Sequence, residues 1–208
     1  MAVAFPTGWE LADLTAIVAA VERGEIVGPV PTLLRRSDGV ALLYPGEVHS
    51  IAGEPESGKT WIALAECARL IEAGERVLYL DFEHSAASIV SRLRDLGATA
   101  DAILDRFAYC RPEGPPTTQA IKEWHSKGDF TLAVIDGVSE AYQLCGLDPN
   151  VNAEAAQFLA MLPRPLADRG AAVLQLDHVT KDRETRGRYA IGAQHKLRSR
   201  SRWATRWR

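Results

Sequence analysis

Apolar residues follow two alternating patterns along most of the chain. Continuous apolar runs of four to six residues alternate with stretches in which apolar residues recur every three or four positions. The runs predict strands at 47–52, 77–81, 107–110, 132–136 and 172–176, and the other stretches predict helices at 59–72, 85–96, 118–125 and 153–162. Strands that are apolar throughout are expected where helices cover both faces of a sheet. The pattern therefore predicts an α/β fold with a mostly parallel central sheet.

A different pattern precedes this alternation. Apolar residues between Leu14 and Val21 follow the spacing of one helix face, and glycines at 24 and 28 supply stop and linker signals. Two short apolar runs, 32–35 and 40–43, flank the turn signal Ser37-Asp38-Gly39. We therefore expect a short N-terminal helix, which packs on the sheet of its own chain or on a neighbouring subunit, and then a β-hairpin.

Charge is distributed unevenly along the 208 residues. The formal net charge is −3, but residues 179–208 carry +8 and residues 1–178 carry −11. A basic end on an acidic body favours contact with a polyanion at that end, with a solvated tail as the alternative. Within 198–208, arginines alternate with Trp203 and Trp207, which suits phosphate contacts combined with stacking on single-stranded nucleic acid.

Cysteine spacing and hydropathy exclude some classes of protein. Cys67, Cys110 and Cys145 are widely spaced and form no C-x-x-C pair, so neither a disulfide framework nor a zinc site is expected. The apolar stretch 11–21 is interrupted by Asp13 and is too short to span a bilayer. A cytoplasmic location and no membrane partner are expected.

The most specific motif lies between the first predicted strand of the sheet and the helix that follows it. The motif G-x-x-x-x-G-K-[ST] is matched by Gly53, Glu54, Pro55, Glu56, Ser57, Gly58, Lys59 and Thr60, with Trp61 directly after. Such a loop turns its backbone N–H groups toward phosphate oxygens, at the positive end of the helix dipole. Lys59 is expected to reach the β and γ phosphates and Thr60 to ligate Mg²⁺. The predicted cofactors are ATP and Mg²⁺.

Two carboxylates follow other strands of the predicted sheet. Asp136 ends the apolar run 132–136, the pattern of a Walker B aspartate, and is expected to support Mg²⁺ through a water. Glu83 follows the strand that comes directly after the P-loop helix. A carboxylate there can accept a proton from the water that attacks the γ phosphate, although spacing alone also fits a solvated loop acid.

The residues around Glu83 resemble a known group of proteins. Residues 77–84, ending in Asp81-Phe82-Glu83-His84, resemble the segment of RecA-fold ATPases that carries the catalytic glutamate. With the P-loop and residues 133–137 and 173–181, the chain resembles the hexameric plasmid replicative helicases of the RepA type, within the RecA and DnaB-like group. The resemblance implies Glu83 as general base and His178 as sensor of the γ phosphate. It also implies a RecA-like P-loop NTPase core at 29–197, after an N-terminal helix and linker at 1–28 and before a basic tail at 198–208.

The polar segment after His178 resembles the second DNA-contacting loop of this group. In that group an arginine follows the loop and reaches the γ phosphate of the neighbouring subunit. Arg186 and Arg188 are the candidates, Lys196 is a third, and a solvated role remains open for each. An arginine that acts across an interface implies a homo-oligomer, such as a hexameric ring. Single-stranded or forked DNA is the implied partner.

Three functions remain open from the sequence. The first is Mg-dependent ATP hydrolysis coupled to DNA, by a RepA-like replicative helicase or a replication accessory ATPase. The second is a RecA/RadA-like recombination or repair ATPase. The third is a nucleotide-gated regulatory or binding module with weak hydrolysis. Because the eleven residues after Leu197 show no strand pattern, the sheet is expected to lack its last strands. This makes the third function credible and puts full helicase action in doubt.

Overall fold

A computed structural model describes residues 11, 13–25, 29–126, 128–178 and 202–204, and it divides the chain into two units, residues 1–30 and 31–208. The first unit contains α1 (Thr15–Glu22), so the predicted N-terminal helix is confirmed. The N-cap Leu14 and the helix residues Val18 and Val21 are each more than half exposed, whereas Ala20 is buried. Among the described residues, no helix is long and apolar enough to cross a membrane.

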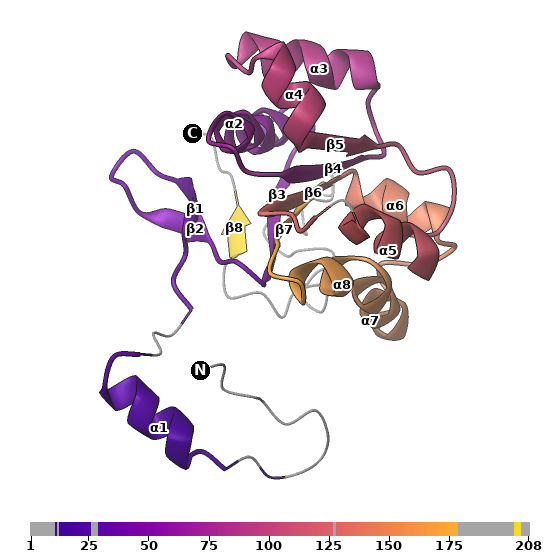
Figure 1. Cartoon of the computed structure of the whole chain (residues 1–208). Coiled ribbons are helices and arrows are strands. Elements are labelled where there is room, and N and C mark those ends of the chain that lie inside the picture. Colours follow the sequence, from indigo (N-terminus) through magenta and orange to yellow (C-terminus); the bar gives the residue numbers. More distant parts are fainter. Residues whose placement is uncertain (1–10, 12, 26–28, 127, 179–201, 205–208) are drawn as a thin grey trace. The chain divides into compact units, whose positions relative to one another are not determined.

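The second unit is built around a parallel sheet, as predicted (Figure 1). Its strands lie in the order β5-β4-β6-β7-β3-β8. Their bounds are β3 (Val48–Gly53), β4 (Val77–Asp81), β5 (Phe107–Cys110), β6 (Leu132–Asp136), β7 (Ala172–His178) and β8 (Arg202–Ala204). The side-chain pattern predicts no strand after Leu197, yet β8 pairs in parallel with Ser50–Ala52 of β3. Pairing at a sheet edge uses backbone N–H and C=O groups, so it needs no apolar pattern.

Helices cover both faces of the sheet, in two separate hydrophobic clusters. One face carries α2 (Lys59–Glu72), α3 (Ala86–Asp95) and α4 (Ala100–Arg106). The other carries α5 (Thr118–Ser126), α6 (Val138–Leu144), α7 (Asn152–Met161) and α8 (Pro163–Ala167). The apolar pattern of the sequence does not reveal α4, α6 or α8, because helices of five to seven residues are too short to show a clear periodicity.

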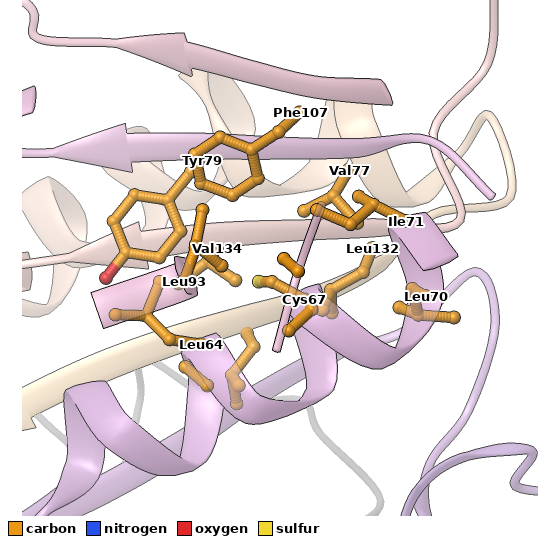
Figure 2. Close-up of a cluster of buried hydrophobic side chains, with 14 of the residues drawn as sticks. Leu64, Cys67, Leu70, Ile71, Val77, Tyr79, Leu93, Phe107, Leu132 and Val134 are labelled. Atoms are coloured by element: carbon orange, nitrogen blue, oxygen red, sulfur yellow. The ribbon is translucent and has the colours of Figure 1, made fainter. Parts of the chain in front are cut away.

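Alternate residues of the inner strands face opposite clusters. On β4, Val77 and Tyr79 join the cluster under α2, whereas Leu78 and Leu80 join the cluster on the other face. Figure 2 shows the α2 side, where the Tyr79 ring lies beside Phe107 and its hydroxyl points away from it. Burying each such side chain contributes about 1.5–3 kcal/mol. The two hydrophobic clusters on opposite faces of the sheet therefore fix the register of its inner strands, two of which end in Asp81 and Asp136.

The predicted hairpin consists of β1 (Leu33–Arg35) and β2 (Ala41–Leu43), which pair antiparallel. It is separate from the main sheet but packs on the α2 side, where Leu33 and Leu43 are buried. The backbone N–H of Leu34 donates to Glu66 Oε1 of α2 at 2.8 Å. The hairpin is therefore held to the core by both apolar and polar contacts.

All six strands end at the same edge of the sheet because they run parallel. Two register pairs place candidate site residues side by side there: Asp81 of β4 opposite Asp136 of β6, and Gly53 of β3 opposite His178 of β7. In open α/β sheets, ligands bind at this carboxyl edge.

Candidate functional site

The loop between β3 and α2 leaves the first turn of α2 open to a ligand. Gly58 is the N-cap with φ of 83°, in the left-handed region that glycine adopts without strain. No side chain in the described part of the chain caps this helix end, so its first backbone N–H groups lack a side-chain acceptor. Free N–H groups at the positive end of a helix dipole bind anions.

The side chain of Lys59, the first residue of α2, folds back onto this loop. Its Nζ donates to the carbonyl oxygens of Gly53, at 3.0 Å, and Glu54, at 2.9 Å. Burial lowers the pKa of Lys59, while the nearby carboxylates of Glu83 and Asp136 act in the opposite direction. The ammonium group is thus held by two carbonyl oxygens, with acidic side chains nearby, at the start of α2.

Asp136 ends β6 beneath the loop and is almost completely buried. Its Oδ2 accepts hydrogen bonds from Thr60 Oγ1, at 3.1 Å, and from the Tyr79 hydroxyl, at 2.6 Å. Burial raises the pKa of Asp136, and these two hydrogen bonds oppose that shift. A hydroxyl and a carboxylate side by side are the oxygen ligands that suit Mg²⁺, which usually takes one or two protein ligands and completes its shell with water and phosphate. The residues present therefore fit a magnesium ion.

Glu83 and His178 meet over the end of β6. The ring Nε2 of His178 donates to Glu83 Oε1 at 2.8 Å, and the ring Nδ1 lies 3.5 Å from Lys59 Nζ. The backbone N–H of His178 donates to Asp177 Oδ1 at 2.9 Å. One imidazole thus links the P-loop lysine to the glutamate after β4.

These residues surround a cavity of about 350 Å³. It is lined by Pro55, Glu56, Ser57, Gly58, Lys59, Thr60, Trp61, Glu83, His84, Arg92, Asp136, Leu176 and His178. Trp61 is 44% exposed, and the guanidinium carbon of Arg92 lies 5.6 Å from the centre of its ring. The cavity therefore has a polar, charged floor and an aromatic side chain on its wall.

Most of the residues singled out from the sequence lie at this cavity. Lys59 and Thr60 at the start of α2, Glu83 after β4, Asp136 at the end of β6 and His178 at the end of β7 converge there. Gly53 and Glu54 contribute carbonyl oxygens to Lys59 rather than cavity wall. Arg186, Arg188 and Lys196 lie outside the described residues.

Three residues of the site were missed by sequence reasoning. Tyr79 supports Asp136 from inside the core, and His84 and Arg92 line the cavity. Tyr79 could have been found from the sequence, because alternation along β4 places it on the same face as Asp81. Arg92 lies on α3, and nothing in its spacing distinguishes it from Arg94, the other arginine of that helix.

Comparisons with known proteins agree with this geometry. Residues 29–184 match the family described as AAA domain. DNA repair protein RadA of Mycolicibacterium smegmatis is 30% identical over 145 residues, and that of Halalkalibacterium halodurans is 29% identical over 140. Each match covers 67% of this chain, and the chain spans less than a third of either relative. RadA of Brucella abortus is 27% identical over 143 residues.

The P-loop, the parallel sheet and these matches lead to one assignment. A family match over residues 29–184 covers most of the chain and includes every cavity residue described above. The RadA matches support a fold of the RecA-like kind, whereas the resemblance to RepA-type helicases remains a prediction. The chain belongs to the AAA domain family and has the fold of a RecA-like P-loop NTPase domain.

Proposed function

We propose that this domain binds ATP with Mg²⁺ in the P-loop cavity, hydrolyses it, and couples hydrolysis to contact with DNA. One observation carries the catalytic part of the proposal. His178 contacts both Lys59, at 3.5 Å, and Glu83, at 2.8 Å, so a general base lies within one side chain of the phosphate-binding lysine. A general base must lie within hydrogen-bond reach of the proton that it removes, directly or through one water, and a water in the cavity beside Glu83 meets that condition.

Phosphate binding follows from the loop and the helix end. The N–H groups at the start of α2 and the Lys59 ammonium supply positive charge and donors for the β and γ phosphates. On binding, Lys59 exchanges the carbonyl oxygens of Gly53 and Glu54 for phosphate oxygens. These carbonyls keep the lysine in place before the nucleotide arrives.

Thr60 and Asp136 are the residues that would hold Mg²⁺. When bound, the ion neutralises phosphate charge and orients the phosphoryl group. Tyr79 keeps Asp136 Oδ2 directed toward Thr60 from within the core. This arrangement needs no further acidic ligand from the chain.

Glu83 removes a proton from the attacking water. The water oxygen forms a bond to the γ phosphorus, the bond from that phosphorus to the β–γ bridging oxygen breaks, and ADP and phosphate leave. His178 keeps Glu83 directed toward the cavity and has an N–H that can turn to a γ-phosphate oxygen. The same ring can thus report whether the γ phosphate is present.

The DNA part of the proposal rests on charge and on the relatives. Residues 179–208 carry a net charge of +8, and the RadA relatives are DNA repair proteins by name. We favour a DNA-dependent repair or recombination ATPase of the RadA kind. A replicative helicase of the RepA kind is the second candidate, favoured by the D-x-E-H ending at Asp81 to His84. Both predict a homo-oligomer with Arg186 or Arg188 at the neighbouring γ phosphate.

The experiment compares ATP hydrolysis by the purified chain with and without single-stranded DNA at several salt concentrations. The proposal predicts Mg-dependent turnover that DNA stimulates, with a stimulation that weakens steeply as salt rises, because phosphate contacts release counterions. Turnover that DNA leaves unchanged, together with nucleotide-dependent binding of another partner, supports the regulatory-module alternative instead. Electron microscopy with DNA and ATP separates filaments from closed rings.

A further inference from the structure

Glu83 lies on a turn, outside any helix or strand. β4 ends at Asp81, and α3 begins at Ala86 after its N-cap Ser85. Residues 83 and 84 therefore lie outside the hydrogen-bond ladders of the helix and the sheet. A general base must nevertheless be held accurately relative to its water. Another set of contacts must fix this turn.

The Asp81 side chain supplies these contacts. Its Oδ1 accepts hydrogen bonds from the backbone N–H groups of Glu83, at 3.0 Å, and His84, at 2.7 Å. Its Oδ2 accepts a hydrogen bond from the Tyr109 hydroxyl at 2.9 Å. The His84 ring Nδ1 lies 3.7 Å from Oδ1. An aspartate that binds N–H groups two and three residues ahead locks a turn in the same way as a helix cap.

The neighbouring strand end closes the turn from the other side. The backbone N–H of Phe82 donates to the carbonyl oxygen of Asp136 at 2.9 Å. At Gly137, an added Cβ would lie 2.8 Å from Glu83 Cγ and 3.1 Å from Phe82 Cβ. Gly137 therefore lets the end of β6 approach the turn closely enough to make this hydrogen bond.

Asp81 itself is not a second base. It is fully buried, and it is absent from the cavity lining of the described residues, so water in the cavity does not reach its carboxylate. Three donors already occupy its two oxygens. Asp81 can therefore affect the reaction only by positioning Glu83, which follows it by two residues.

We propose that Asp81 is a positioning residue that, with Tyr109 and Gly137, fixes the turn so that Glu83 faces the P-loop cavity. This inference rests on the proposed role of Glu83. It assigns a task to the first residue of the D-x-E-H ending, and it connects the edge strand β5, through Tyr109, to the catalytic carboxylate. The turn contributes Glu83 and His84 to the cavity lining and the P-loop contributes Pro55 to Thr60, so we expect ATP affinity to depend mainly on the P-loop.

The test measures kcat and ATP affinity of the full chain for Asp81→Ala, Asp81→Asn, Tyr109→Phe and Gly137→Ala. We expect Asp81→Ala to lower kcat on the order of 100-fold, since a general base contributes that much or more, with nearly unchanged ATP affinity. Asp81→Asn keeps one oxygen for the two N–H groups and can donate its amide to Tyr109, so it should restore most of the rate. Tyr109→Phe should lower kcat less than Asp81→Ala. Asp105→Ala, at an exposed carboxylate on α4, is the matched control and should leave both quantities unchanged.

A double-mutant cycle separates positioning from general damage. In a Glu83→Gln background, Asp81→Ala should cause almost no further loss of kcat, because residues that act as one unit are strongly non-additive. An additive loss, an equal loss of ATP affinity, or an Asp81→Asn variant as slow as Asp81→Ala would each overturn the inference. If Asp81→Ala does not fold, the same cycle with Tyr109→Phe decides the question. Equal rates for wild type and Glu83→Gln alone would instead contradict the proposed function.

Discussion

His178 Nε2 lies 2.8 Å from Glu83 Oε1, although the two residues are 95 positions apart in the chain. The contact spans from the end of β7 to the turn after β4, across the end of β6. It exists because parallel strands bring their carboxyl ends to one edge. The pair thus connects the proposed base to the strand beside the P-loop, and it has consequences for how the site distinguishes ATP from ADP.

Replacing His178 by alanine should affect ATP more than ADP. The ring N–H is the donor that can turn from Glu83 to a γ-phosphate oxygen, and ADP lacks that phosphate. Removing such a donor typically lowers kcat on the order of 100-fold. Turnover and equilibrium binding of ATP and ADP, measured by calorimetry, check this. Equal losses of affinity for both nucleotides would rule out a sensor role.

Tyr79→Phe should weaken the response to magnesium. The hydroxyl donates to Asp136 Oδ2 at 2.6 Å inside the core, and its loss leaves that carboxylate with fewer partners. Losing a hydrogen bond to a charged group costs about 1.5–3 kcal/mol in the free energy of unfolding. A magnesium titration of ATPase activity should show a several-fold higher half-maximal concentration. An unchanged titration curve alongside a lower stability would mean that Tyr79 serves packing alone.

His49 should make the fold less stable in acid. Burial lowers the pKa of this completely buried histidine below 6.5, and its Nε2 accepts the backbone N–H of Tyr44 at 3.0 Å. His49 therefore binds a proton more readily in the unfolded chain than in the folded chain. The free energy of unfolding consequently falls as the pH drops below about 6.5. The slope from one group is at most about 1.4 kcal/mol per pH unit. Urea unfolding between pH 7.5 and 5.5 should give a shallower slope for His49→Phe than for wild type, and identical slopes would contradict this.

Trp61 should report nucleotide binding. Its ring is on the cavity wall, partly exposed and covered by Arg92, so a bound nucleotide changes its surroundings. We expect ATP to change the tryptophan fluorescence of wild type and of Trp124→Phe, since Trp124 lines a different cavity. The Trp61→Phe variant should lose the signal while still hydrolysing ATP. A signal that persists in Trp61→Phe would place the nucleotide elsewhere.

Much of the fold could be predicted because most of its strands and helices show in the apolar pattern of neighbouring residues. The strands of the sheet core are continuous apolar runs, and α2, α3, α5 and α7 are long enough to show their periodicity. The short α4, α6 and α8 lack that length. β8 pairs through backbone groups at a free edge, so its residues carry no apolar pattern that would reveal it.

The candidate site was predictable only in part, for a different reason. Lys59 and Thr60 follow from a motif with a known backbone geometry, and Asp136 follows from a strand that ends in a carboxylate. The supporting residues Tyr79 and Tyr109 act through hydrogen bonds to residues far away in the sequence, Asp136 and Asp81. Such contacts depend on strand order and register, which no local pattern encodes.

The most direct measurement compares Glu83→Gln with wild type for both ATP binding and ATP hydrolysis. Because Glu83 acts on the water and not on the nucleotide, the variant should bind ATP with nearly unchanged affinity, while kcat falls by about 100-fold or more. Wild-type turnover in Glu83→Gln would contradict the account, and this carboxylate would then play no part in the chemistry.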